Sequence, residues 1–384
     1  MEKNFIQTIS DSYEKNKILF YDNTLRDGEQ FPGVYFTNSQ KVKIAKILYD
    51  LGVDFFNVGF PAVSKLERNA IQAILEVIPN QKTVALARCI PEDIKMIKDL
   101  GVPTVSLFFP GSEILRKSKG KFQDDDEIDR IILECLKYAK SLGLNTIFAF
   151  EDTTRCDPLW LIERYKKYSI YTDAFGLTDT VGAASPWEIE KLTLLLNTLN
   201  KPLITHFHND LGLANANSLV AAKSGCTILG CTVSGIGERA GNASLEEVST
   251  AVKYLLDEES NIKQELLYKA TKQVQDITNI RLDSLRPLVG DNAFKHESAI
   301  HVDSLLIDEN SYQFVLPETM GRKMEFCLGK HSGVRGIIGF HKFYNLNLSD
   351  ESYLSTQKII TSCIESGKKN ITEEVLKQYE LLTQ

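Results

Sequence analysis

Two histidines that lie two positions apart are the residues of this chain best suited to binding a metal. His206 and His208 flank Phe207 in the segment 205–210 (THFHND). Alternate side chains of a β-strand share one face, so both imidazoles would point the same way. Neutral imidazoles can hold a divalent ion when oxygen ligands complete its shell. The spacing also fits two polar residues at a strand end, so its interpretation depends on the rest of the chain.

Possible oxygen ligands stand after apolar segments that have the character of buried strands. Asp27 comes shortly after the apolar segment 18–21, and Asn242 ends the glycine-rich stretch 235–242. Asp27 could give the ion a carboxylate oxygen, and Asn242 could add an amide oxygen. The alternatives are a helix cap or a salt bridge to Arg26 for Asp27, and a hydrogen bond that shapes the loop for Asn242.

Four further residues could bind substrate or transfer protons. Arg26 presents a planar fork of donors that suits a carboxylate or a polarised carbonyl, with a surface ion pair as the alternative. Glu151 could act in acid–base work or pair with Arg155. Thr180 could bind a substrate carboxylate or cap a strand. His301 could be an acid or a base near neutral pH, or a structural histidine.

Strand-like and helix-like segments alternate from residue 18 to residue 255, which indicates a parallel sheet. Eight strand–helix units in about 240 residues fit a closed (β/α)8 TIM barrel better than an open doubly wound sheet. In a barrel the carboxyl ends of the strands meet at one mouth, where the candidate residues would gather. The expected strands are 18–21, 55–59, 83–87, 104–109, 146–150, 171–175, 203–208 and 228–233.

The alternating pattern changes near residue 259, so we expect two domains. Residues 1–258 form the catalytic barrel with a short polar N-terminal arm. Residues 259–384 form a smaller, mainly helical region that contributes to the active site and to a dimer. The barrel is expected to hold the metal site, because all of the candidate ligands belong to it.

Composition excludes several classes of partner. The chain has 44 basic and 51 acidic residues, a net charge of −7, which argues against a nucleic-acid surface. No run of about 18 apolar residues is present, so we expect no membrane span. The N-terminal arm lacks the apolar core of a signal peptide, and the seven scattered cysteines fit a reducing compartment. We therefore expect a cytoplasmic protein.

Three motifs together resemble the acyl-CoA-condensing branch of the metal-dependent (β/α)8 lyase superfamily. They are 23–30 (NTLRDGEQ), 206–212 (HFHNDLG) and 235–242 (GIGERAGN). The stretches 294–306 and 328–333 also resemble that branch, especially homocitrate synthases of the nitrogen-fixation type. The branch includes isopropylmalate, citramalate and homocitrate synthases, and the similarity runs from about residue 18 to residue 340.

The resemblance implies a Claisen condensation of acetyl-CoA with a 2-oxo acid in a cytoplasmic homodimer. One divalent ion, Mg²⁺, Mn²⁺ or Zn²⁺, would polarise the ketone. His301 would match a catalytic histidine that is donated across the dimer interface, and Glu151 the acidic residue after the fifth strand. The implied metal ligands are Asp27, His206 and His208, with Asn242 nearby, and the implied contacts of the 2-oxo acid are Arg26, Gln30 and Thr180.

The same resemblance leaves the 2-oxo acid open. We expect 2-oxoglutarate, which would give homocitrate. Lysine-pathway homocitrate synthases hold the second carboxylate with a His and an Arg. The corresponding positions in this chain are Leu86 and Ile147. A more apolar acid, such as 2-oxoisovalerate or pyruvate, is therefore the alternative, with the choice made around Leu86, Ser106 and Ile147. An acyl-CoA lyase fits less well, because such lyases carry a cysteine in this glycine-rich loop and 235–242 contains none. A non-catalytic barrel also fits less well, because it would not need the metal ligands.

Overall fold

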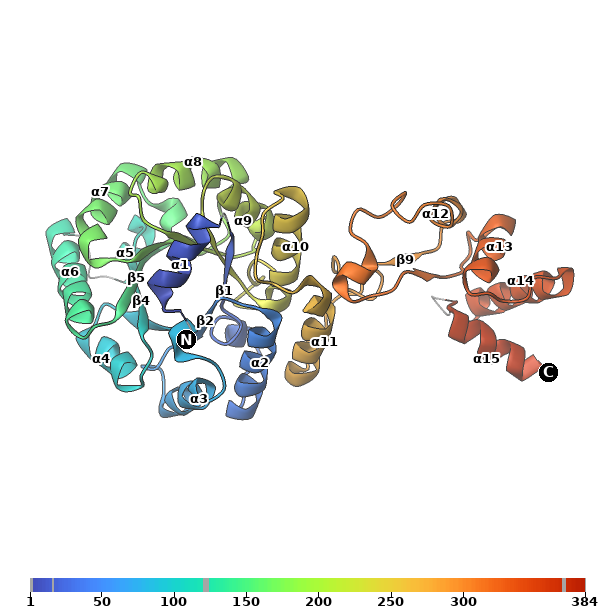
Figure 1. Ribbon diagram of the computed structural model, residues 1–384, viewed down its shortest axis with the longest axis horizontal. Helices are drawn as coiled ribbons and strands as arrows, with labels where there is room; N and C mark the ends of the chain where they lie inside the picture. Colours follow the sequence, from blue (N-terminus) through green and yellow to red (C-terminus); the bar gives the residue numbers. More distant parts are fainter. Residues whose placement is uncertain (1–2, 16, 120–123, 368–370, 384) are drawn as a thin grey trace. The chain divides into compact units, whose positions relative to one another are not determined.

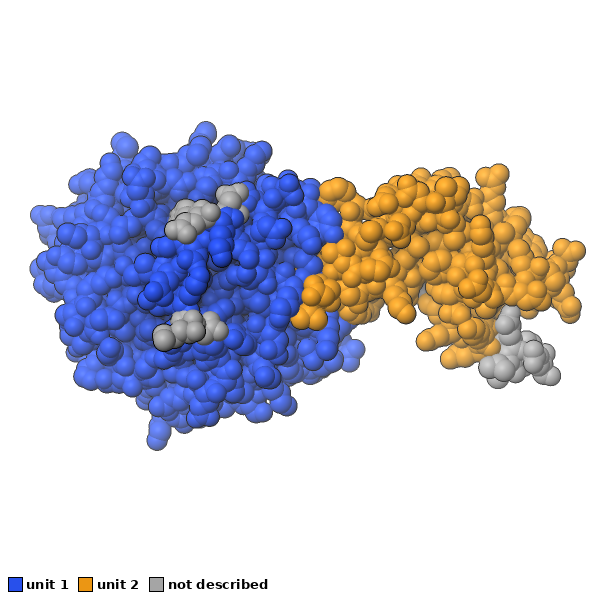
Figure 2. Space-filling view, viewed as in Figure 1, with its two compact units in different colours: residues 1–264, 269–281 blue, residues 265–268, 282–384 orange. Residues whose placement is uncertain are grey.

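The computed structural model describes residues 3–15, 17–119, 124–367 and 371–383. The chain divides into two compact units, residues 1–264 with 269–281 and residues 265–268 with 282–384 (Figure 2). The expected boundary lay after residue 258, and of helix α11 (Leu267–Thr278) residues 269–278 group with the barrel. Among the described residues, no helix has the length and apolar character needed to cross a membrane.

The first unit is a closed barrel of parallel strands in sequential order, which confirms the expected (β/α)8 fold (Figure 1). β8 pairs with β1 from Leu19↔Ile228 to Asp22↔Cys231 and so closes the ring. The strands are β1 (Leu19–Asp22), β2 (Phe55–Gly59), β3 (Thr83–Arg88), β4 (Thr104–Pro110), β5 (Asn145–Glu151), β6 (Ala174–Asp179), β7 (Leu203–Phe207) and β8 (Ile228–Cys231).

One strand lies further along the chain than its sequence pattern indicated. The sixth strand was expected at 171–175, but β6 begins at Ala174, because Ser169–Tyr171 forms a 3₁₀ turn. The amide of Thr172 donates to the carbonyl of Ser169 and ends that turn. The shift places Asp179 at the end of β6 and Thr180 directly after it.

Most helices on the outside of the ring bury one apolar face against the strands, while α5 (Glu113–Ser118) has no buried residue. In α2 the buried residues include Ile44, Leu48 and Leu51, and Gly52 ends the helix with a φ of 101°, a left-handed conformation that glycine adopts without a steric penalty. The barrel helices are α2 (Asn38–Leu51), α3 (Lys65–Leu75), α4 (Pro91–Asp99), α5 (Glu113–Ser118), α6 (Asp125–Ser141), α7 (Pro158–Tyr168), α8 (Pro186–Asn197), α9 (Ala214–Lys223), α10 (Leu245–Leu255) and α11.

The N-terminal arm is not the simple polar extension that we expected. It contains helix α1 (Phe5–Glu14), which lies across the middle of the ring in Figure 1. Phe5 and Ile9 are buried in one apolar cluster with residues at the amino ends of the strands, among them Leu19 and Phe55. Two apolar residues one helical turn apart thus close the end of the barrel opposite its mouth.

The second unit is mainly helical, as expected. A short parallel pair, β9 (Lys295–His296) and β10 (Glu325–Phe326), accompanies its helices. Its core contains Val302, Phe326, Ile337, Phe340 and Ile359. The helices are α12 (Ala299–Leu305), α13 (Val334–Phe343), α14 (Asp350–Glu365) and α15 (Glu373–Thr383).

A buried lysine joins two loops at the mouth of the barrel. The Nζ of Lys41, on α2, lies 2.6 Å from carboxylate oxygens of both Glu29 and Glu67. Glu29 accepts from the amide of Phe36, and Glu67 accepts from the amide of Phe60. The lysine side chain is 1% exposed, so the two carboxylates depend on it for neutralisation.

We predict that Lys41→Met lowers the free energy of unfolding by about 3–5 kcal/mol, because it leaves two partly buried carboxylates unpaired. Urea unfolding followed by circular dichroism measures the change. Lys43→Met, on an exposed position of the same helix, should stay within about 0.5 kcal/mol. Adding Glu29→Gln and Glu67→Gln to Lys41→Met should recover part of the loss, and no recovery would show that charge is not the cause.

Candidate active site

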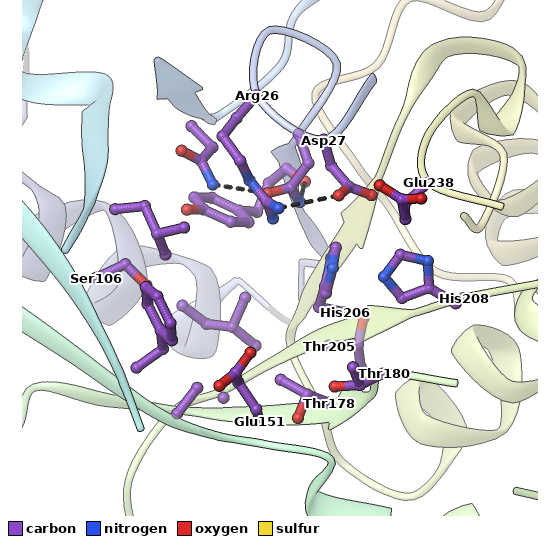
Figure 3. A pocket seen from close by; sticks show the side chains of 18 of the residues that line it. Arg26, Asp27, Ser106, Glu151, Thr178, Thr180, Thr205, His206, His208 and Glu238 are labelled. Atoms are coloured by element: carbon purple, nitrogen blue, oxygen red, sulfur yellow. Dashed lines mark hydrogen bonds and ion pairs between the residues drawn. The ribbon is translucent and has the colours of Figure 1, made fainter. Parts of the chain in front are cut away.

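The carboxyl ends of the strands surround a cavity of about 340 Å³ (Figure 3). Side chains from β1 to β7 and from the segment after β8 line it, so it is the mouth at which a parallel barrel places its ligands. The lining residues are Tyr21, Asn23, Arg26, Asp27, Gln30, Asn57, Phe60, Leu86, Ser106, Phe108, Ile147, Ala149, Glu151, Gly176, Thr178, Thr180, Ile204, Thr205, His206, His208, Glu238 and Arg239.

Asp27, His206 and His208 come together in this cavity. One possible ligand atom from each lies within 4.8 Å of the other two, which is the separation expected of groups that share one ion. The two imidazole rings are 5.0 Å apart. His206 belongs to β7 and His208 follows it, so the strand alternation does put both rings on the inner face.

The surroundings of these side chains favour the protonation states that bind metals. Burial alone would raise the pKa of the Asp27 carboxyl, but the Arg26 guanidinium 2.9 Å away and the polar neighbours hold that pKa to about 2. Loss of hydration lowers the pKa of His206 to about 3 and also lowers the pKa of His208. At neutral pH the carboxyl is therefore ionised and both imidazoles are neutral, as metal coordination requires.

Two buried polar atoms beside these side chains could interact with a bound ion. His208 Nδ1 and Asn242 Oδ1 find no hydrogen-bond partner among the residues that the structure describes. Unpaired buried polar atoms are costly, and an ion with its bound water is one way of satisfying them. The residues present therefore fit a divalent cation.

Asn242 also has the loop-shaping role that was its alternative. Its Nδ2 donates to a carboxylate oxygen of Asp27 and to the carbonyl of Ile236, 3.2 Å away. Gly237 makes this close packing possible, because a Cβ there would lie 2.1 Å from the Asn242 amide nitrogen. The glycine-rich loop thus brings backbone up to the Asp27–Asn242 pair.

Arg26 forms the ion pair that was the alternative to ligand binding, and its side chain also lines the cavity. Its Nη1 lies 2.9 Å from the Asp27 carboxylate and 3.3 Å from Gln30 Oε1. The Nε of Arg26 has no partner among the described residues. Arg26 is thus an ion-pair partner of Asp27 that still has donors for a ligand, and Gln30 lies beside it in the lining.

Thr180 is held in place by residues that sequence reasoning did not single out. Its hydroxyl accepts from the amide of Asp152 at 2.8 Å. Its carbonyl accepts from Arg239, which also forms a two-pronged ion pair with Asp210. Asp210 and Arg239 belong to the HFHNDLG and GIGERAGN motifs, so the signal was present, although no contact between the motifs could be read from it.

Glu151 has a different partner from the one considered. The structure pairs it with Lys119 at 2.7 Å, whereas Arg155 binds Asp152. Glu151 ends β5 and points into the cavity, where Figure 3 shows it across from Asp27 and His206. A carboxylate so placed could exchange a proton with a bound substrate.

The wall that was expected to choose the substrate is largely apolar. Leu86, Ser106 and Ile147 all line the cavity, together with apolar residues that sequence reasoning missed, Phe60, Phe108, Ala149 and Ile204. Three of these, Phe108, Ala149 and Ile204, stand at inward-facing positions of β4, β5 and β7, and the alternation along each strand would have identified them. Arg88, the cationic side chain at the end of β3, lies outside the lining and binds Asp93 through contacts of 2.8 and 3.0 Å.

His301 is not among the residues that line this cavity. It lies on α12 of the second unit, where its ring stacks on Tyr312 with the centroids 4.0 Å apart. His296, the other histidine of that segment, lies 6.5 Å from it, ring to ring.

Comparisons with known proteins cover both units. A family model described as HMGL-like matches residues 17–277, and one described as homocitrate synthase post-HMGL domain-like matches residues 288–368. A 2-isopropylmalate synthase of Sulfurisphaera tokodaii is 38% identical over 93% of this chain and 94% of its own. An (R)-citramalate synthase of Methanocaldococcus jannaschii is 38% identical over 87% of this chain and 68% of its own.

Solved structures share the fold at lower identity. An HMG-CoA lyase of Bacillus subtilis superposes with a TM-score of 0.59 at 22% identity, over 68% of this chain and 93% of that one. At this identity the similarity shows the barrel fold alone, because one fold serves many reactions.

We predict that His208→Ala weakens the binding of Mn²⁺ by more than about 100-fold, because it removes a ligand. Loss of a group that only orients a ligand costs roughly 10–100-fold in affinity. Calorimetric titration of the metal-free protein measures the affinity, and circular dichroism checks the fold. The matched control is His331→Ala, at an exposed position of the second unit, which should bind Mn²⁺ as the wild type does. Unchanged affinity in His208→Ala would remove His208 from the ligand set.

Proposed function

This chain belongs to the HMGL-like family, together with 2-isopropylmalate and citramalate synthases, and on that premise we propose that it condenses acetyl-CoA with a 2-oxo acid whose side chain is apolar. The relatives support this acid in place of the 2-oxoglutarate that we expected. The model named after homocitrate synthase matches residues 288–368, whereas every lining residue of the cavity precedes residue 240. The cavity residues that support this choice all belong to the barrel.

The apolar wall of the cavity carries this proposal. Leu86, Phe108 and Ala149 are partly exposed within the lining, so an apolar substrate group would cover carbon surface that is otherwise open to water. Among the described lining residues, the cationic side chains are Arg26 and Arg239, both after strand ends. A second carboxylate placed against this wall would be buried without a counter-charge, which is costly.

The residues at the mouth would orient the reacting groups. Asp27, His206 and His208 would hold a divalent ion, Mg²⁺, Mn²⁺ or Zn²⁺, that supplies Lewis-acid polarisation of the ketone. Arg26 would donate to the ketone oxygen or the neighbouring carboxylate, and Thr180 would bind that carboxylate. These contacts fix the 2-oxo carbon, which leaves its side chain to extend towards the opposite wall on β3 to β5.

Proton transfers complete the reaction. A base removes a proton from the acetyl methyl group, and the resulting carbon forms a bond to the ketone carbon as the ketone oxygen gains negative charge. That oxygen then takes a proton, and water hydrolyses the thioester to release CoA. Glu151 in the cavity and His301 on α12 are the proposed acid–base residues, because their side chains can take and return a proton.

We further propose a homodimer in which the second unit supplies His301 to the barrel of the other copy. The residues around His301 present exposed apolar side chains: Ile300 is 70% exposed, Ile307 88% and Phe314 70%. Several large apolar side chains exposed within one short segment are typical of an interaction site. The acidic net charge and these apolar side chains fit a protein partner rather than nucleic acid.

An assay of CoA release tests the proposed reaction. Purified protein with acetyl-CoA and Mg²⁺ or Mn²⁺ should release free thiol with 2-oxoisovalerate or pyruvate at a higher kcat/KM than with 2-oxoglutarate. A chelator should abolish the reaction, and excess metal should restore it. Thiol release with none of the acids would contradict the reaction, and a preference for 2-oxoglutarate would contradict the apolar wall.

A mixing experiment tests the role of His301. His301→Ala and His208→Ala should each be nearly inactive alone. Mixed and allowed to exchange subunits, they should recover roughly a quarter of wild-type activity, because half of the dimers hold one copy of each and each of those has one intact site. If His301 serves the barrel of its own chain, mixing restores nothing. A mixture of His208→Ala with Asp27→Asn, whose changes share one barrel, is the control for subunit exchange without rescue.

A further inference from the structure

Helix α1 packs against the end of the barrel opposite the substrate cavity. Phe5, with no exposed surface, and Ile9 belong to the apolar cluster that closes the amino end of the barrel. The ring of Phe5 lies 4.7 Å from that of Phe55, at the start of β2. The active site uses only the opposite end of the strands, so the proposed reaction gives this helix no role.

Three side chains belong both to this cluster and to the lining of the cavity. They are Tyr21 on β1, Ile147 on β5 and Ile204 on β7. Ile204 comes two residues before His206 on the inner face of the same strand, and Ile147 comes two before Ala149. Alternate residues of a strand are about 6.6 Å apart. Tyr21, Ile147 and Ile204 therefore form the floor of the cavity, one step below the residues that would contact the substrate.

Helix α1 belongs to the same apolar cluster as these three side chains. Protein interiors are packed at crystal-like density, so side chains in one layer are held in position by the layer beneath. The barrel interior is built of such layers. Phe5 and Ile9 occupy the amino end of this cluster with Leu19 and Phe55, so the floor rests on them through the packing of the whole cluster.

From these observations we propose that helix α1 sets the depth of the 2-oxo acid pocket, with Phe5 and Ile9 as positioning residues that hold Tyr21, Ile147 and Ile204 in place. The inference rests on the proposed function, and it adds a determinant of substrate length outside the mouth of the barrel. A shorter side chain at position 5 leaves a void under the floor, and neighbouring side chains relax into such voids only in part. The side chains of the floor can then move into this void and make room for a longer substrate.

Phe5→Ala, with Ile9→Ala as a milder second variant, tests the proposal. The ratio of kcat/KM for 2-oxohexanoate over 2-oxobutanoate should rise by about 10-fold in Phe5→Ala, the scale on which one or two methylene groups are discriminated in an apolar pocket. The rise should be smaller in Ile9→Ala, and Phe5→Leu, which refills most of the space, should restore the wild-type ratio. Ile6→Ala is the matched control, since Ile6 lies on the same helix and is 46% exposed.

Two further measurements separate a floor effect from general damage and from failure of the proposed reaction. The affinity for Mn²⁺ should stay unchanged in Phe5→Ala, because Asp27, His206 and His208 lie at the other end of the strands. Calorimetric binding of both acids in the presence of Mn²⁺, without acetyl-CoA, should show the same change of ratio as turnover does.

Each outcome bears on one of the two proposals. A shifted binding ratio in a protein that releases no CoA would support the floor and contradict the reaction. Turnover with the same ratio in Phe5→Ala as in Ile6→Ala would overturn the floor and leave the reaction standing. A loss of Mn²⁺ affinity as large as the loss of acid binding would also overturn it, because the effect would then be a general loosening of the barrel.

Discussion

Closure of the barrel by the pairing of β8 with β1 is the constraint on which the rest of the site depends. The ladder from Leu19↔Ile228 to Asp22↔Cys231 makes the first and last strands neighbours. Asp27, which follows β1, thereby comes within reach of His206 and His208, which lie two strands away around the ring. A parallel barrel gathers residues from distant parts of the chain at one mouth in this way.

The closed ring also determines the protonation states of the side chains at that mouth. Its interior removes water from the imidazoles, which keeps them neutral, while Arg26 keeps Asp27 ionised. Of the three proposed ligands only Asp27 is charged, and Arg26 lies 2.9 Å from its carboxylate. Pre-organisation of this kind lowers the cost of binding, because the ligands need little rearrangement.

In the proposed reaction, one part of the barrel binds the ketone and another part selects the substrate. Charged and polar residues gather after the strand ends, while the middle of the strands presents Leu86, Phe108, Ile147 and Ala149. The barrel can therefore bind the 2-oxo acid group in one way while the residues of the apolar wall differ, because one fold can carry many different sites. The amino-terminal helix extends this layering downwards and links the wall to a segment far from the mouth.

The sequence by itself determined the fold and most of the candidate ligands. Alternating apolar strands and amphipathic helices predicted the eight-fold barrel, and the spacing of His206 and His208 predicted one shared face, because both patterns are local periodicities. The tertiary structure alone decided the partners. Distant segments meet in these contacts: Lys119 pairs with Glu151, Arg239 binds both Thr180 and Asp210, and Phe5 packs on Phe55. No periodicity records such contacts, since they depend on how the closed barrel brings its layers together.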